Sequence, residues 1–335
     1  MGALALGLAL AACGGGAGSG TGGTTALGNG VATSSASPPA PAVNQLAAAE
    51  HPRSTEFPSA AGRSLKQLTR LVRSTARLGP STHTYTTGRP RFSFALTDRA
   101  NRFIYAPTAL YIARSPGAPA QGPFLAAADP LAVAPQYRSN ENDGPGGLKA
   151  VYWAQLPMPR SGVYDVLSLT RVGSHLVGAT ATVPVALSVP IPGVGQRPPD
   201  IATDTLASEH GKLKLVTTRV PPENMHSVSL DQVLGRRPVA LLFSTPELCT
   251  SRVCGPVTDI MVELQRQFGN RIAFIHQEIY VRNQPARGLR SQLHAFHLET
   301  EPWLFTINRH GVITARLDGV FGVHEARAAL EAALR

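Results

Sequence analysis

Residues 238–268, PVALLFSTPELCTSRVCGPVTDIMVELQRQF, decide how the last third of the chain is interpreted. The continuous apolar run at 238–243 is typical of a strand that is buried on both faces. The loop after it carries Cys249 and Cys254. Apolar residues then recur at helical spacing through 256–268. The stretch therefore predicts a strand, a loop with two cysteines and a helix in succession.

Strands and helices continue to alternate from this stretch to the end of the chain. The pattern predicts a strand at 271–279, a helix at 286–297, a hairpin of strands at 303–307 and 312–317, and a helix at 323–334. The order β-α-β-α-β-β-α, with cysteines before the first helix, resembles that of the thioredoxin family. The resemblance implies a thioredoxin-like α/β domain over residues 205–335.

The resemblance also implies a role for Pro302. The segment Glu301-Pro302-Trp303 precedes the third predicted strand, where the family places a cis-proline next to its redox cysteines. Pro302 would then shape the groove that receives the substrate chain.

The cysteine motif departs from that of the family. The family has Cys-x-x-Cys, whereas four residues separate Cys249 from Cys254 here. The segment Cys254-Gly255-Pro256 offers a second register, similar to Cys-Gly-Pro-Cys without its second cysteine. Cys249 lies six residues after Phe243, close to the family's usual gap, and Cys254 lies eleven after it. We therefore place Cys249 at the position of the nucleophile.

The expected chemistry follows from that position. Unpaired backbone N–H groups at a helix N-terminus stabilise a nearby thiolate, and a lowered pKa makes a cysteine reactive. Cys249 would attack a substrate disulfide, and Cys254 would resolve the mixed disulfide. The sequence thus predicts a thiol–disulfide oxidoreductase that acts on protein thiols and disulfides. No cofactor and no metal are expected.

The first thirteen residues indicate export and a lipid anchor. Residues 3–12 form an apolar segment of signal-peptide length, too short to span a membrane. The segment ends in Leu10-Ala11-Ala12-Cys13, which resembles a bacterial lipobox, and this resemblance implies lipidation of Cys13. We expect a protein held outside the cytoplasm on the cell membrane, where a membrane redox partner is possible.

Composition predicts five segments. Residues 1–13 are a lipoprotein signal peptide with its lipobox, and residues 14–84 are a disordered tether with a short basic amphipathic helix at 63–78. Period-two patterns at 85–189 predict an immunoglobulin-like β-sandwich. A proline-rich linker at 190–204 leads into the thioredoxin-like domain at 205–335. The predicted fold class is therefore multidomain, a β-sandwich followed by an α/β domain.

The net charge of the chain limits the classes of partner that it is expected to bind. The formal net charge is +10, which suits an anionic membrane surface or a nucleic acid. No nucleic-acid-binding motif is present in the sequence. We therefore expect a membrane surface and no nucleic acid.

Four other interpretations of the cysteine pair remain open. The pair can be a structural disulfide, or it can lie in an adaptor that binds partners without catalysis. A Cys-x4-Cys pair also occurs in some thiol peroxidases of the same fold, although Pro246 occupies the position of their threonine. Two thiolates and a histidine suit Cu(I), so copper handling is the fourth possibility. The candidate histidines for it are His276, His294, His297, His310 and His324.

Overall fold

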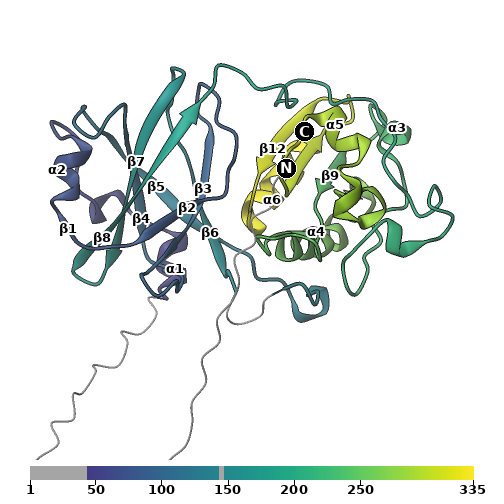
Figure 1. Cartoon of the computed structure of the whole chain (residues 1–335), viewed down its shortest axis with the longest axis horizontal. Coiled ribbons are helices and arrows are strands. Elements are labelled where there is room, and N and C mark those ends of the chain that lie inside the picture. The colour runs from purple at the N-terminus through teal and green to yellow at the C-terminus, as the bar shows by residue number, and fades with distance from the viewer. Residues whose placement is uncertain (1–43, 143–146) are drawn as a thin grey trace, which may run out of the picture. The chain divides into compact units, whose positions relative to one another are not determined.

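The computed structural model describes residues 44–142 and 147–335. Residues Ala42–Arg335 make one compact unit. Two β-sheets organise this unit (Figure 1). The first has eight strands in the order β1-β8-β7-β4-β5-β6-β3-β2, and the second has four in the order β10-β9-β11-β12. Cys13 and the predicted signal peptide lie outside the described residues.

The eight-stranded sheet is curled nearly into a barrel. Strands β1 (Val72–Thr75) and β2 (Arg77–Pro80) stand at opposite ends of the sheet order, yet only Ala76 separates them in the chain. The two ends of the sheet must therefore lie next to each other. The other strands are β3 (Arg91–Thr97), β4 (Thr108–Ala113), β5 (Gln121–Pro130), β6 (Ala150–Gln155), β7 (Gly162–Val172) and β8 (His175–Val185).

Large apolar side chains fill the interior of this sheet. Phe92, Phe94 and Leu96 recur at every second position of β3, and all three are buried in one cluster with Tyr152 of β6. A period of two places alternate side chains on the same face of a strand. The expected strand pattern in this region is therefore confirmed.

Two short helices lie before the barrel strands, α1 (Leu46–Glu50) and α2 (Leu65–Thr69). The Ser64 hydroxyl accepts a hydrogen bond from the Gln67 N–H at the start of α2. The amphipathic helix expected over 63–78 therefore ends at Thr69. Residues after it instead form β1 and β2, because pairing with β8 and β3 offers their backbone a sheet partner. Pairing with the rest of the fold overrides the helical period of the sequence here.

Helices cover both faces of the second sheet. Its strands are β9 (Val239–Phe243), β10 (Ala273–Gln277), β11 (Trp303–Ile307) and β12 (Ile313–Asp318). Its helices are α3 (Leu230–Val233), α4 (Cys254–Phe268), α5 (Ser291–Phe296) and α6 (Val323–Ala333). Side chains of α4 and α6 pack on one face, and those of α3 and α5 pack on the other. Strand β9 is buried along its whole length, as its apolar run predicts.

The predicted fold class is wrong. The structure is mixed α/β, with a nearly closed eight-stranded sheet, a second four-stranded sheet and few helices, in place of an immunoglobulin-like sandwich followed by a thioredoxin-like domain. A period of two identifies strands but not which strands pair, and the helix expected at 63–78 concealed the two strands that bring the sheet ends together. The order of elements likewise did not reveal that Leu131 and Val151 of the barrel region enter the core of the second sheet.

Polar groups also join the two sheets. The Arg91 guanidinium of β3 forms an ion pair with Glu325 of α6 at 2.7 Å. The Asp129 carboxylate of β5 accepts hydrogen bonds from the backbone N–H groups of His324 and Glu325 at the start of α6. None of the helices in the described ranges is long and apolar enough to cross a membrane.

Candidate functional site

The two cysteines lie between the end of β9 and the start of α4. Cys254 is the first residue of α4, and Cys249 lies in the turn that precedes it. The Arg252 N–H donates to the Cys249 carbonyl at 3.2 Å, and Arg252 has a φ of +57°. This turn reverses the chain between the cysteines. Both cysteines are buried free thiols, with exposed fractions of 6% for Cys249 and 0% for Cys254.

The two thiols have opposite electrostatic settings. The hydrogen bond that the Cys254 thiol donates to the Cys249 sulfur is the largest influence on Cys249, and it lowers the pKa of Cys249 to about 5. Burial opposes this shift, whereas the Ser251 hydroxyl and the backbone N–H groups of Cys254 and Val253 add to it. Burial, followed by the same thiol–thiol hydrogen bond, raises the pKa of Cys254 well above its ordinary value. At neutral pH the pair therefore holds one thiolate and one thiol.

A carboxyl group lies beside the sulfur atoms. The donor atoms of Cys249, Cys254 and Glu301 all lie within 4.8 Å of one another. Burial, followed by the charge of Cys249, raises the pKa of Glu301. Sequence reasoning missed Glu301, and its position next to Pro302 was the one available signal.

Pro302 lies immediately before β11, and the Glu301–Pro302 peptide bond is cis. The Pro302 carbonyl accepts a hydrogen bond from the Gly319 N–H at 2.9 Å, which ties this turn to the end of β12. The predicted site residues thus come from two parts of the chain. Cys249 and Cys254 lie between β9 and α4, and Pro302 lies just before β11, where the neighbouring Glu301 approaches both sulfur atoms. The fourth predicted residue, Cys13, lies outside the described part of the chain.

A cavity of about 280 Å³ opens next to the cysteine turn. Val253 and Pro256 line it from the turn and from α4, and Leu131 and Val151 line it from the barrel region. Gly255 lies close by, where an added Cβ would stand 2.6 Å from the Glu141 carbonyl oxygen. The start of α4 is therefore held against the segment that connects β5 to β6.

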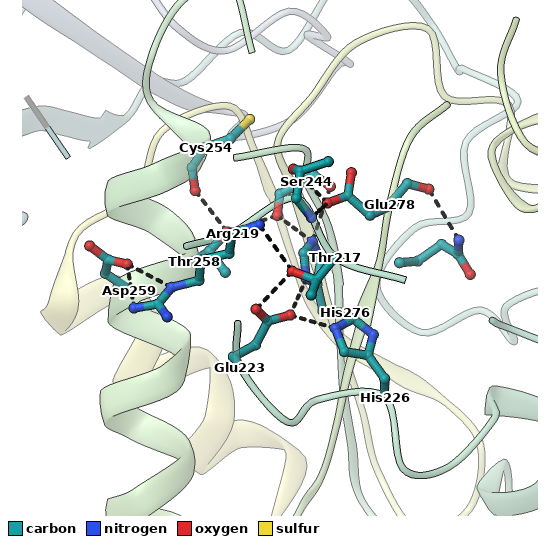
Figure 2. A network of polar contacts seen from close by, with 12 residues as sticks. Thr217, Arg219, Glu223, His226, Ser244, Cys254, Thr258, Asp259, His276 and Glu278 are labelled. Atoms are coloured by element: carbon teal, nitrogen blue, oxygen red, sulfur yellow. Dashed lines mark hydrogen bonds and ion pairs between the residues drawn. The ribbon is translucent and has the colours of Figure 1, made fainter. Parts of the chain in front are cut away.

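A second group of buried polar side chains lies beside α4 (Figure 2). The carboxylate oxygen Oε1 of Glu223 lies 2.5 Å from His226 Nε2 and 2.7 Å from His276 Nδ1. All three side chains are buried, and their donor atoms lie within 4.8 Å of one another. His276 was a candidate copper ligand for the cysteines, but the structure places it with Glu223 and His226. The spacing Glu223-x-x-His226 is the one sequence signal for this group.

Hydrogen bonds connect the second group to the cysteine helix. His276 Nε2 lies 2.9 Å from the Ser244 hydroxyl, which lies 2.8 Å from the Thr258 hydroxyl. The Thr258 hydroxyl donates to the Cys254 carbonyl at 2.7 Å. Figure 2 shows this chain of contacts running from His276 to α4.

Comparison with known proteins adds no relative. No protein-family model matches the chain, and no curated protein matches it. The case for a function therefore rests on the arrangement of these side chains.

Proposed function

We propose that the protein is a thiol–disulfide oxidoreductase that uses Cys249 as its nucleophile and Cys254 as its resolving thiol. The observation that carries the proposal is the proximity of two buried free thiols, whose sulfur atoms lie within 4.8 Å of each other, and the pKa values of the two thiols shift in opposite directions. A structural disulfide does not require its two cysteines to differ in pKa. Thiol–disulfide exchange requires one thiolate that attacks the substrate and one thiol that later resolves the mixed disulfide.

The reaction begins with the Cys249 thiolate. Its sulfur attacks one sulfur of a substrate disulfide, so the substrate S–S bond breaks, a mixed disulfide forms and the other substrate sulfur leaves as a thiolate. Cys254 then loses its proton and attacks the Cys249 sulfur. The Cys249–Cys254 disulfide forms, and the second substrate thiolate is released. The substrate gains two electrons and the cysteine pair loses two. The reverse sequence oxidises a substrate dithiol.

Glu301 supports the second attack. Its carboxylate lies within 4.8 Å of both sulfur atoms and can accept the proton that Cys254 gives up. A raised pKa brings Glu301 nearer to the pH at which it can take up and release a proton. The cycle closes when a second dithiol or disulfide protein resets the pair. The signal-like segment and Cys13 support the proposal that this exchange occurs outside the cytoplasm, next to a membrane redox partner.

The decisive experiment is the reduction potential of the pair in the full chain. We expect equilibration in glutathione buffers to give a value between about −120 and −270 mV, the range of exchange proteins. A potential below about −300 mV would instead identify a structural disulfide. Variants Cys249→Ser and Cys254→Ser separate the roles, because only Cys254→Ser should accumulate a mixed disulfide with substrate.

A peroxide assay separates exchange from peroxidase activity. Stoichiometric hydrogen peroxide should oxidise Cys249 slowly while a small disulfide oxidises it fast. Rapid oxidation by peroxide would favour the peroxidase alternative.

A further inference from the structure

The buried group of Glu223, His226 and His276 has the donor set of a metal site. Two imidazole nitrogens and one carboxylate oxygen are ligands that Zn²⁺ binds in proteins. Glu223 is 8% exposed, His226 is 3% exposed and His276 is fully buried. Buried polar groups need partners, and these three point their donor atoms at one another (Figure 2).

Glu223 Oε1 lies between two imidazole nitrogens, and each nitrogen needs a proton or a metal ion on the side that faces this oxygen. His276 Nε2 lies 3.0 Å from the Ser244 carbonyl oxygen, and His276 Nδ1 faces the Glu223 carboxylate. The carboxylate can only accept, so Nδ1 must carry a proton or a metal ion, whereas Nε2 can either donate to the Ser244 carbonyl or accept from the Ser244 hydroxyl at 2.9 Å. His226 Nε2 faces the same Glu223 oxygen and needs a proton or a metal there as well.

The hydrogen bonds around His276 and Glu223 match those of metal ligands. A ligating histidine usually donates its second N–H to a carbonyl or carboxylate, and a ligating carboxylate is itself hydrogen-bonded. The Ser244 carbonyl serves His276 in this way. The Thr217 hydroxyl donates to Glu223 Oε2 at 2.9 Å, which leaves Oε1 for the ion. His226 Nδ1 is buried and has no partner among the described residues, so His226 lacks the second contact that His276 makes.

The position of the group suggests what an ion would stabilise. Strand β10, which carries His276, stands at the end of its sheet order. The His276 N–H donates to the Met225 carbonyl at 2.9 Å, so the chain around 223–226 runs along this edge. An ion bound by Glu223, His226 and His276 would fasten that chain to β10. Donor atoms around a tetrahedral zinc are roughly 3.3 Å apart, given bonds of about 2.0 Å. The two imidazole nitrogens would move away from Glu223 Oε1 by less than about 1 Å on binding.

We propose that Glu223, His226 and His276 form a buried three-ligand zinc site that holds the 223–226 segment on the edge of the second sheet. The site is separate from the cysteine pair and does not depend on the redox function. It needs no exchange with solvent during a reaction, which agrees with its burial.

The test uses the full chain with Cys249→Ser and Cys254→Ser, so that these thiols cannot bind the metal. After incubation with Zn²⁺ and gel filtration, elemental analysis should find one zinc per chain, and removal of zinc with a chelator should lower the unfolding temperature. Co²⁺ in place of zinc should give visible bands of a tetrahedral site without a thiolate charge-transfer band. Absence of retained zinc, or a thiolate band, would overturn the proposal.

Two variants locate the site. His226→Gln should abolish stoichiometric zinc, whereas His324→Gln, at an exposed histidine, should retain it. Thr217→Val keeps the shape of the side chain but removes its hydrogen bond to Glu223, and it should weaken zinc binding by about 10- to 100-fold. Thr314→Val, on β12, is the matched control and should bind zinc as the parent does. Zinc retained at parental affinity by both His226→Gln and Thr217→Val would contradict the assignment.

Discussion

At the scale of single residues, one hydrogen bond sets the chemistry of the cysteine pair. The Cys254 thiol donates to the Cys249 sulfur, so it stabilises the Cys249 thiolate while remaining protonated itself. The first turn of α4 adds backbone N–H groups, and helix N-termini favour negative charge in general. The wide Cys-x4-Cys spacing still brings the two sulfurs together, because the chain reverses at Arg252.

Cys254→Ala should therefore raise the pKa of Cys249 from about 5 toward its ordinary value of 9.0. The rate of alkylation by iodoacetamide, followed by mass spectrometry from acidic to alkaline pH, reports the thiolate fraction. The midpoint of this profile should move to higher pH. Ser251→Ala should move it in the same direction by less, because the Ser251 hydroxyl is the weaker donor. A midpoint that stays near pH 5 in Cys254→Ala would contradict the assignment of the thiol donor.

Glu301→Gln tests the proton acceptor. The substitution keeps the size of the side chain but removes its basic oxygen, so the attack of Cys254 on the mixed disulfide should slow by roughly 100-fold, a typical general-base effect. Alkylation of Cys249 should not slow, since Glu301 acts after the first step. Rapid-quench analysis of the mixed disulfide measures the second step. Glu299→Gln, at an exposed position of the same turn, is the control and should leave both steps unchanged.

The sequence predicted part of this site and not the rest. Cys249 and Cys254 were predicted from their position between a buried strand and a helix, and Pro302 was predicted from its position directly before a strand. The contribution of Glu301 depends on a chain reversal that brings the segment before β11 beside the turn after β9. The Glu223, His226 and His276 group likewise joins a loop to strand β10. Periodicity predicts elements, but it does not predict which side chains meet across the fold.

At the scale of elements, the two end strands of the eight-stranded sheet, β1 and β2, decide the architecture. Strands β1 and β2 are short, exposed and basic, so they lack the alternation that identified the other strands. The helical spacing of Leu65 and Leu68 in α2 continues to Val72 at the start of β1, which explains why the helix was predicted to extend too far. The predicted strands around 239–318 and the helix at 256–268 correspond closely to β9–β12 and α4, because buried strands and α4 carry strong local patterns, whereas the helix predicted at 286–297 is observed only as α5 (Ser291–Phe296).

Gly178→Ala tests the pairing of β1 with β8. A Cβ added to Gly178 would stand 2.6 Å from Cγ2 of Val72, and valine is stiff at χ1, so the strands must shift. The substitution should reduce the free energy of unfolding by about 1–3 kcal/mol, as overpacking usually does. Adding Val72→Ala should recover most of the loss. Gly79→Ala on β2 is the control, since nothing lies within 4 Å of its added Cβ. Urea unfolding measures all four proteins, and an unchanged Gly178→Ala would argue against this register.

At the scale of the whole compact unit, charged groups couple the two sheets. Arg91, whose side chain is 11% exposed, pairs with Glu325 while donating to the backbone carbonyls of Asp318 and Val320. Gly319 allows the sheets to approach, because an added Cβ would stand 1.8 Å from the Ser81 carbonyl oxygen and its φ is +74°. The second sheet therefore depends on the barrel for both its core and its polar contacts, which separate domains would not require.

His83 makes this coupling depend on pH. Its ring and backbone N–H contact the Asp318 carboxylate, and the hydrogen bond to Asp318 outweighs burial and raises the pKa of His83 above 6.5. A raised histidine pKa stabilises the fold fully below the unfolded value of 6.5, and this contribution is lost as the pH rises through the folded value. The free energy of urea unfolding should therefore fall as the pH rises above about 6.5, by under about 1 kcal/mol because the ring is partly exposed. His83→Gln should remove this part of the pH dependence while other groups keep theirs. An identical pH dependence in both proteins would show that the contact between His83 and Asp318 does not help to hold the sheets together.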